Sequence, residues 1–280
     1  MRIDTLTALW SLLPIACLNV LVWLYFTGWF HLEASSNLLT SVPNLPTSKM
    51  ASSIKRLTSV IQNATAKHSA TVIFIHGLGD SGQGWAPVGE ELGQYLPHVK
   101  FIFPNAPSQP VTLNFGMRMP SWYDIVDLGD LNQEQDEKGM LASRQQVMQI
   151  VRDEIEENGI PANRIVIGGF SQGCVMGLLT GLTAEYKFAG IVSLSGYVPL
   201  HKKFMNMVSD ANRKTPIFWG HGDADQVVRY PYGVNSVDLL KANKYNVNFN
   251  TYPGMGHGSC NQEIRDLLAF LKQTIPEDSA

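Results

Sequence analysis

The chain has 280 residues, of which 45% are hydrophobic, so it is long enough to bury one sizeable core. Its formal net charge of -3, without any basic run interleaved with aromatic residues, gives no reason to expect a nucleic-acid partner. The three cysteines are scattered and odd in number, which argues against a disulfide framework. No C-x-x-C or H-x-x-x-H spacing is present, so we expect no metal site.

The first long stretch, residues 5–32, contains no Asp, Glu, Lys or Arg. About 20 such residues are enough to span a bilayer as a helix. Trp10 and Trp29 stand near the two ends, where aromatic rings favour the membrane interface. We expect residues 1–32 to be a membrane anchor or an extension outside the core. The alternatives are a cleaved signal peptide and translation from Met50, which would omit the segment.

Residues 33–65 are interpreted as a linker, because they open with a stretch rich in Ser, Asn, Thr and Pro. Residues 66–280 are expected to form one catalytic domain, in which runs of strand length alternate with runs of helix length. This alternation predicts an α/β fold, with a mostly parallel central sheet and helices on both faces. The predicted strands are 71–75, 99–103, 164–167, 188–195, 216–221 and 247–252, and the predicted helices are 85–95, 143–158, a run after residue 171, 234–242 and 260–271.

The first predicted strand runs directly into an H-G-x-G motif at residues 76–79. In hydrolases a strand followed by this motif supplies one backbone N–H to an oxyanion hole. A plain glycine-rich turn is the alternative. A phosphate-binding P-loop is rejected, because no G-x-x-x-x-G-K-[ST] motif is present.

A long, proline-punctuated and unusually apolar loop is predicted at residues 104–127. A loop this apolar must cover either the core or a ligand. Methionine and aromatic side chains are pliable and suit an acyl chain. Packing of any one of them against the core is the alternative. The candidate acyl-binding residues are Leu113, Met117, Met119 and Trp122.

Ser171 is the candidate nucleophile. It lies in Gly169-Phe170-Ser171-Gln172-Gly173, a G-x-S-x-G motif between a β-branched run and an apolar run that is compatible with a helix. This pattern is typical of a nucleophile elbow, in which a sharp strand-to-helix turn exposes the serine and needs small neighbours. The helix would direct its N-terminal N–H groups toward the place where an oxyanion forms.

A serine nucleophile needs an acid and then a histidine, in this chain order, each after a later strand. His257 follows the last predicted strand and is the candidate general base. Asp223 and Asp225 both follow the preceding strand, and spacing alone does not choose between them. His221 lies before both carboxylates, which is the wrong order, so a structural role is expected for it. The backbone N–H groups of Leu78 and Gln172 are the candidate oxyanion donors.

Six motifs lie at residues 74–80, 104–107, 120–124, 168–173, 221–225 and 255–257. Together they resemble the acyl-protein thioesterases, also described as lysophospholipase-like carboxylesterases, of the α/β-hydrolase fold. The resemblance implies that Asp225 is the acid of the triad and that the backbone N–H groups of Leu78 and Gln172 are the oxyanion donors. It also implies that the apolar loop covers an acyl channel. It does not extend to residues 1–49, and Gly196-Tyr197 departs from the family pattern, in which Trp is frequent.

We therefore expect a serine hydrolase that removes long acyl chains from protein cysteine thioesters without a cofactor. A lysophospholipase or general carboxylesterase is the first alternative, and a catalytically silent, membrane-anchored binding protein is the second. The expected partners are S-acylated proteins or acyl lipids as substrates, and a membrane through residues 5–32, with a weak homodimer left open. We expect the catalytic domain to face the cytoplasm.

Overall fold

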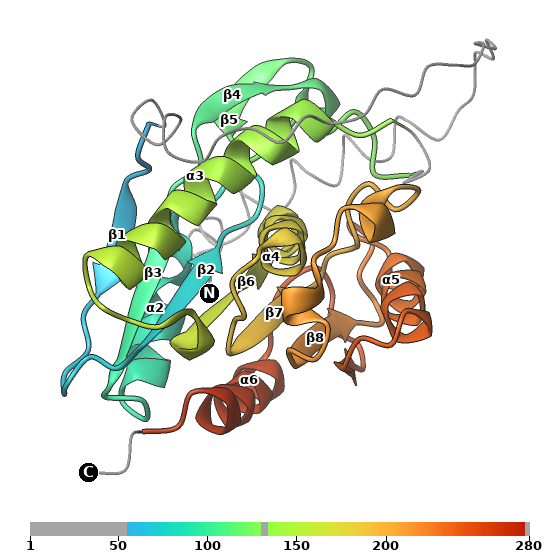
Figure 1. Cartoon of the computed structure of the whole chain (residues 1–280). Helices are drawn as coiled ribbons and strands as arrows, with labels where there is room; N and C mark the ends of the chain where they lie inside the picture. Colours follow the sequence, from blue (N-terminus) through green and yellow to red (C-terminus); the bar gives the residue numbers. More distant parts are fainter. Residues whose placement is uncertain (1–54, 130–133, 278–280) are drawn as a thin grey trace, which may run out of the picture. The chain divides into compact units, whose positions relative to one another are not determined.

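The computed structural model describes residues 55–129 and 134–277 (Figure 1). Its strands are β1 (Ser59–Gln62), β2 (Ala70–Ile75), β3 (Val99–Pro104), β4 (Ser108–Val111), β5 (Met117–Pro120), β6 (Ile165–Phe170), β7 (Gly190–Leu194), β8 (Ile217–Gly222) and β9 (Val247–Tyr252). Its α-helices are α2 (Gly82–Gly93), α3 (Glu137–Glu156), α4 (Gln172–Thr183), α5 (Tyr230–Ala242) and α6 (Asn261–Thr274). Short 3₁₀ turns are η3 (Thr112–Asn114), η4 (Ala162–Arg164), η5 (Phe204–Asn206) and η6 (Asp210–Asn212).

The central sheet has seven strands in the order β1-β3-β2-β6-β7-β8-β9. All neighbouring pairs are parallel except β1 and β3, which are antiparallel. Because parallel strands are joined by crossover helices, their carboxyl ends meet at one edge of the sheet, where loops can bring distant residues together. The predicted α/β class with a mostly parallel sheet is confirmed.

Strand β1 corrects the predicted domain boundary. It lies inside residues 33–65, the predicted linker, and it pairs with β3 through partners such as Val60 and Phe103. The hydrolase domain therefore begins before residue 66. Four residues in a mostly half-buried edge strand carry too little alternation of apolar and polar side chains to be predicted from sequence.

The predicted loop at residues 104–127 contains two short strands. β4 and β5 pair in antiparallel register as a hairpin separate from the main sheet, with Ser108 opposite Pro120 and Val111 opposite Met117. Pro110 lies in β4 and Pro120 in β5. A two-stranded hairpin consists of edge strands, where proline is tolerated.

Side chains of each buried strand alternate between two hydrophobic clusters, one on each face of the sheet. In β2, Ile73 and Ile75 belong to the cluster that packs against α3, α4 and α5, whereas Val72 and Phe74 belong to the cluster that packs against α2 and α6 (Figure 1). Burial on both faces requires apolar residues at nearly every strand position, which is why these strands are continuous apolar runs.

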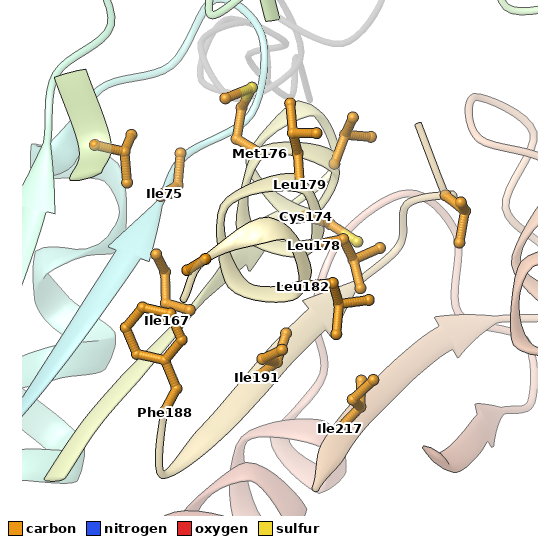
Figure 2. Close-up of a cluster of buried hydrophobic side chains, with 14 of the residues drawn as sticks. Ile75, Ile167, Cys174, Met176, Leu178, Leu179, Leu182, Phe188, Ile191 and Ile217 are labelled. Atoms are coloured by element: carbon orange, nitrogen blue, oxygen red, sulfur yellow. The ribbon is translucent and has the colours of Figure 1, made fainter. Parts of the chain in front are cut away.

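Helix α4 is the most buried helix in the described part of the chain, since every residue from Gln172 to Leu182 is buried. Figure 2 shows its side chains packed over those of β2, β6, β7 and β8. Gly177 lets the helix approach β6 closely, because a Cβ atom there would lie 2.6 Å from Cα of Gly168. This close packing fixes the position of the helix's first residue and of Ser171 just before it.

Within residues 55–129 and 134–277, no helix is both long and apolar enough to cross a bilayer. The predicted anchor at residues 5–32 lies outside the described residues, so it stays a prediction.

Candidate active site

Ser171 occupies the strained turn between β6 and α4. Its backbone dihedrals are φ 55° and ψ -118°, a conformation that non-glycine residues rarely adopt. The turn closes only because both flanking glycines lack side chains. A Cβ atom would lie 2.1 Å from the carbonyl oxygen of Ile75 at Gly169 and 1.9 Å from it at Gly173. The elbow geometry therefore follows from the G-x-S-x-G pattern.

The structure brings Ser171, His257 and Asp225 into one hydrogen-bonded series. Nε2 of His257 lies 3.0 Å from Oγ of Ser171, and Nδ1 of His257 lies 2.8 Å from Oδ2 of Asp225. The imidazole also packs on the ring of Phe170, with centroids 4.8 Å apart. With its Nδ1–H donated to the carboxylate, the imidazole presents an unprotonated Nε2 to the serine hydroxyl.

Asp225 is held ionised inside the protein, where its side chain is completely buried. Its Oδ1 accepts hydrogen bonds from the backbone N–H groups of Val227 at 2.9 Å and Val228 at 3.0 Å. Burial alone would raise the pKa of Asp225, but hydrogen bonds from His221, His257 and Val227 outweigh burial and lower the pKa to about 2. The carboxylate is therefore charged at neutral pH.

The two aspartates that spacing could not separate have different surroundings. Asp223 is exposed, and its Oδ1 accepts a hydrogen bond from the N–H of Gly254. His221 is fully buried, donates from Nε2 to the carbonyl of Val228 at 2.8 Å, and lies 3.5 Å from Oδ2 of Asp225. It therefore stabilises the loop that carries Asp225 and is not part of the hydrogen-bonded series that includes Ser171, in agreement with the structural role expected for it.

The two candidate oxyanion donors lie beside Ser171. Gln172 is the first residue of α4, so its N–H has no partner within the helix and lies at the positive end of the helix dipole. The loop that carries Leu78 is close, because a Cβ atom on Gly77 would lie 3.3 Å from Cβ of Ser171. Among the described residues, neither N–H has a hydrogen-bond acceptor, so both are available to a ligand.

Sequence reasoning assigned a role only to the backbone of Gln172 and missed its side chain. The buried amide accepts a hydrogen bond from the N–H of Trp122 at 2.8 Å and donates to the carbonyl of Tyr123 at 2.8 Å and to Oγ of Ser121 at 3.1 Å. Sequence carries no signal for these contacts, since they join residues about fifty positions apart. The amide ties the segment after the hairpin to the nucleophile elbow.

The four candidate acyl-binding residues are not equivalent. Leu113 and Met117 are 40% and 54% exposed on the hairpin, together with Phe115 at 76%. Met119 is half-buried, and its Sδ would lie 3.9 Å from a Cβ atom on Gly79, next to the Leu78 loop. Trp122 is completely buried and is the one candidate without accessible surface. The structure thus places three of the four where a ligand can touch them.

The described part of the chain offers little support for a metal site or for a cysteine nucleophile. No group of three or more His, Cys, Asp and Glu side chains there is arranged to hold a metal ion. Cys174 and Cys260 are free thiols. Burial raises the pKa of the Cys174 thiol to about 12, so it stays protonated and is a poor nucleophile.

Comparison with known proteins identifies the family. Residues 57–275 match the phospholipase/carboxylesterase family. The chain belongs to this family. The predicted resemblance is confirmed by acyl-protein thioesterase 1 of Neurospora crassa, which is 50% identical over 80% of this chain and 95% of its own length. Acyl-protein thioesterase 1 of Yarrowia lipolytica is 50% identical over 76% of this chain and 96% of its own.

Solved structures agree with this membership. SOBER1 of Arabidopsis thaliana superposes with a TM-score of 0.70 and 31% identity, over 74% of this chain and 99% of its own. Acyl-protein thioesterase 2 of Zea mays gives a TM-score of 0.67 and 29% identity, over 78% of this chain and 99% of its own. The α/β-hydrolase fold predicted for the chain is the fold of this phospholipase/carboxylesterase family.

Proposed function

We propose that the chain is an acyl-protein thioesterase, a serine hydrolase that cleaves long-chain acyl thioesters from protein cysteines. The observation that carries the chemistry is the series in which Ser171, His257 and Asp225 are joined by contacts of 3.0 Å and 2.8 Å. The substrate class is supported by the two fungal relatives, which are acyl-protein thioesterases at 50% identity over most of both chains.

In the first half of the reaction, Oγ of Ser171 attacks the thioester carbonyl carbon while Nε2 of His257 accepts the hydroxyl proton. The C–S bond then breaks, and the imidazolium returns the proton to the departing cysteine sulfur. The ionised Asp225 stabilises the imidazolium and keeps the imidazole in the tautomer that accepts at Nε2. In the second half, His257 activates a water molecule that hydrolyses the acyl-serine ester and regenerates the enzyme.

The negative charge that forms on the carbonyl oxygen needs donors in place before the reaction. We assign this role to the backbone N–H groups of Leu78 and Gln172. Each is worth about 3 kcal/mol to the transition state if it behaves like other oxyanion-hole donors. No cofactor takes part in these steps.

We assign the acyl chain to the apolar surface of the β4–β5 hairpin. Leu113, Met117 and Met119 are its proposed contacts, because they offer accessible apolar surface and Met119 lies next to the Leu78 loop. Trp122 has no accessible surface, so we propose that it does not contact the acyl chain and instead supports the hairpin residues that do. Burial of the acyl chain would stabilise the complex by about 0.8 kcal/mol for each CH₂ group removed from water.

A lysophospholipase or carboxylesterase activity is the second candidate, favoured by the family, whose description covers both phospholipases and carboxylesterases. The same residues hydrolyse an oxygen ester by the same steps. The experiment that tests the proposal compares turnover of a palmitoyl-cysteine peptide with turnover of a lysophospholipid, with Ser171→Ala as the blank. Faster thioester turnover supports protein deacylation, and faster lysophospholipid turnover contradicts it.

A catalytically silent binding protein is the remaining alternative. A fluorophosphonate probe phosphonylates only a serine that an adjacent base activates. We expect the folded protein to be labelled at Ser171, and no label, or a label that survives Ser171→Ala, would contradict the enzymatic assignment.

We also propose that residues 5–32 anchor the catalytic domain to a membrane on its cytoplasmic side, where S-acylated cysteines would be accessible to it. The proposal rests on the absence of charged residues in that stretch. Release of the full-length protein from membranes by a carbonate wash would contradict it. A weak homodimer stays open and would appear as a concentration-dependent mass in analytical ultracentrifugation.

A further inference from the structure

The ring of His76 is completely buried beside the candidate oxyanion hole, and the proposed mechanism gives it no role. Both of its nitrogens have backbone partners. Nδ1 lies 2.7 Å from the carbonyl oxygen of Gly77, and Nε2 lies 3.1 Å from the backbone N of Ala106. Two short contacts from one buried imidazole indicate that the ring is held in a single orientation.

These partners determine the tautomer. The carbonyl oxygen of Gly77 can only accept, so Nδ1 must carry the proton, and the N–H of Ala106 can only donate, so Nε2 must be bare. Burial lowers the pKa of His76, although the hydrogen bond to Gly77 and the charge of Asp80 act in the opposite sense. The ring is therefore neutral at neutral pH, with one donor and one acceptor, and both are used.

The Gly77 carbonyl belongs to the same peptide unit as the N–H of Leu78. Because a trans peptide is planar, its C=O and N–H point in opposite directions, and a hydrogen bond that fixes the oxygen also fixes the direction of the N–H. A hydrogen bond to the carbonyl additionally polarises the peptide and strengthens its N–H as a donor. The imidazole thus binds the carbonyl oxygen of the Gly77–Leu78 peptide, and the N–H of the same peptide is the candidate oxyanion donor.

The preceding peptide is held as well. Nε1 of Trp122 donates to the carbonyl oxygen of His76 at 2.9 Å, and the backbone N–H of Trp122 donates to the side chain of Gln172 at 2.8 Å. His76, Trp122 and Gln172 are all buried. One continuous set of hydrogen bonds therefore joins the peptide of the first candidate donor to the residue that carries the second.

We propose that His76 is a positioning residue for the oxyanion hole, which orients the Gly77–Leu78 peptide through its Nδ1–H and leaves the Leu78 N–H aimed at the substrate oxyanion. This inference rests on the proposed function, because it needs Leu78 to be a donor. The imidazole itself does not touch the substrate. Its effect is expected in the transition state, where the oxyanion forms, and much less in the binding of the substrate.

Two amide substitutions separate the two hydrogen bonds of the ring. The amide nitrogen of His76→Asn occupies nearly the position of Nδ1 and keeps a donor for the Gly77 carbonyl. The longer His76→Gln places its amide oxygen near the position of Nε2, which keeps an acceptor for Ala106 and loses the bond to Gly77. The readouts are kcat and KM for p-nitrophenyl octanoate, and the inhibition constant of an alkyl trifluoromethyl ketone, whose adduct with Ser171 carries an oxyanion.

We expect His76→Gln to lower kcat about tenfold or more, since misplacing one oxyanion donor sacrifices part of its ~100-fold or larger contribution. KM should change less than about twofold, and the affinity for the ketone should fall in parallel with kcat. His76→Asn should retain most of both. Equal losses in the two variants, better activity in His76→Gln, or a loss confined to KM would overturn the proposal.

Thermal unfolding of each variant shows whether it is folded. If neither His76 variant folds, Trp122→Phe decides, because it removes the Nε1–H bond to the His76 carbonyl and keeps an aromatic ring. A parallel fall in kcat and ketone affinity supports the proposal, and unchanged values overturn it. The assay uses a simple ester and the full-length protein, so failure of the chain on a palmitoyl-cysteine peptide alone contradicts the thioesterase proposal and leaves this comparison intact. A wild type that turns over no ester contradicts both.

Discussion

Oδ2 of Asp225 lies 2.8 Å from Nδ1 of His257, whereas Asp223, two residues earlier, accepts instead from the N–H of Gly254. The strand β8 ends at Gly222, and the turn that follows buries the side chain of Asp225 and leaves Asp223 exposed. Asp223 and Asp225 carry the same carboxylate group, but only Asp225 is placed where that group reaches the imidazole of His257.

This difference predicts an asymmetric pair of variants. Asp225→Asn should lower kcat by about 10⁴-fold, as the corresponding change does in serine proteases, because an amide fixes the wrong imidazole tautomer. Asp223→Asn is the matched control and should change kcat by less than about threefold, since exposed polar substitutions have small effects. Steady-state hydrolysis of p-nitrophenyl octanoate measures both, and equal losses would contradict the assignment.

Much of this site could be predicted from sequence, because its parts are short local patterns. The G-x-S-x-G motif requires small residues at Gly169 and Gly173, and the order of serine, acid and histidine follows from the topology of the sheet. Spacing could not choose between Asp223 and Asp225, because the choice depends on which side chain the turn buries. The side-chain contacts of Gln172 were missed because they join residues about fifty positions apart. Those of His76 were missed because they are made to backbone groups of Gly77 and Ala106, which leave no pattern in the sequence.

The fold shows the same division. The strands β2, β3, β6, β7 and β8 are buried almost throughout, so their largely apolar runs were visible in the sequence. The edge strand β1 and the β4–β5 hairpin were missed, because each of their strands has four residues. Strands of that length have little periodicity, and their pairing depends on partners that sequence does not reveal.

The elbow glycines make a second prediction. Gly173→Ala should destabilise the protein by about 3 kcal/mol or more and abolish labelling of Ser171, because its Cβ would lie 1.9 Å from the carbonyl oxygen of Ile75. Gly256→Ala is the control for stability, since a Cβ there has no heavy atom within 4 Å. Urea unfolding followed by circular dichroism measures both. A Gly173→Ala protein as stable as the wild type would contradict the packing described for the elbow.

A buried carboxyl on α6 predicts an unusual pH dependence of stability. Glu263 is completely buried, and neither of its carboxyl oxygens has a hydrogen-bond partner in the described residues. Burial, assisted by the charge of Asp266, raises the pKa of Glu263 from 4.5 to about 8. Between these values the folded state binds a proton that the unfolded state does not, so the stability due to this group is present below pH 4.5 and is lost as pH rises toward 8.

Glu263→Gln removes this titration. We measure the free energy of unfolding of the variant and of the wild type by urea titration at each pH. The difference between them should shift in favour of the variant by roughly 2–4 kcal/mol between pH 5 and pH 8. Glu156→Gln, at an exposed position on α3, is the control and should follow the wild type. A Glu263→Gln protein whose stability runs parallel to the wild type across this pH range would show that Glu263 is ionised in the folded state.

The proposed acyl surface predicts an effect that depends on chain length. Met119→Ser should raise KM for a p-nitrophenyl palmitate several-fold, because it removes apolar contact worth about 1–2 kcal/mol. KM for the acetate ester should stay within about twofold of the wild type, since that substrate has no chain to bury. Equal changes for the two esters would indicate that Met119 does not contact the acyl chain.

The central claim is that Ser171 removes acyl groups from protein cysteines, and turnover of a palmitoyl-cysteine peptide by the full-length protein tests it most directly. A lysophospholipid is the competing substrate, and Ser171→Ala is the blank. We predict that kcat/KM is higher for the peptide and that Ser171→Ala is inactive on both substrates. A higher kcat/KM for the lysophospholipid, or thioester turnover that persists in Ser171→Ala, would contradict the claim.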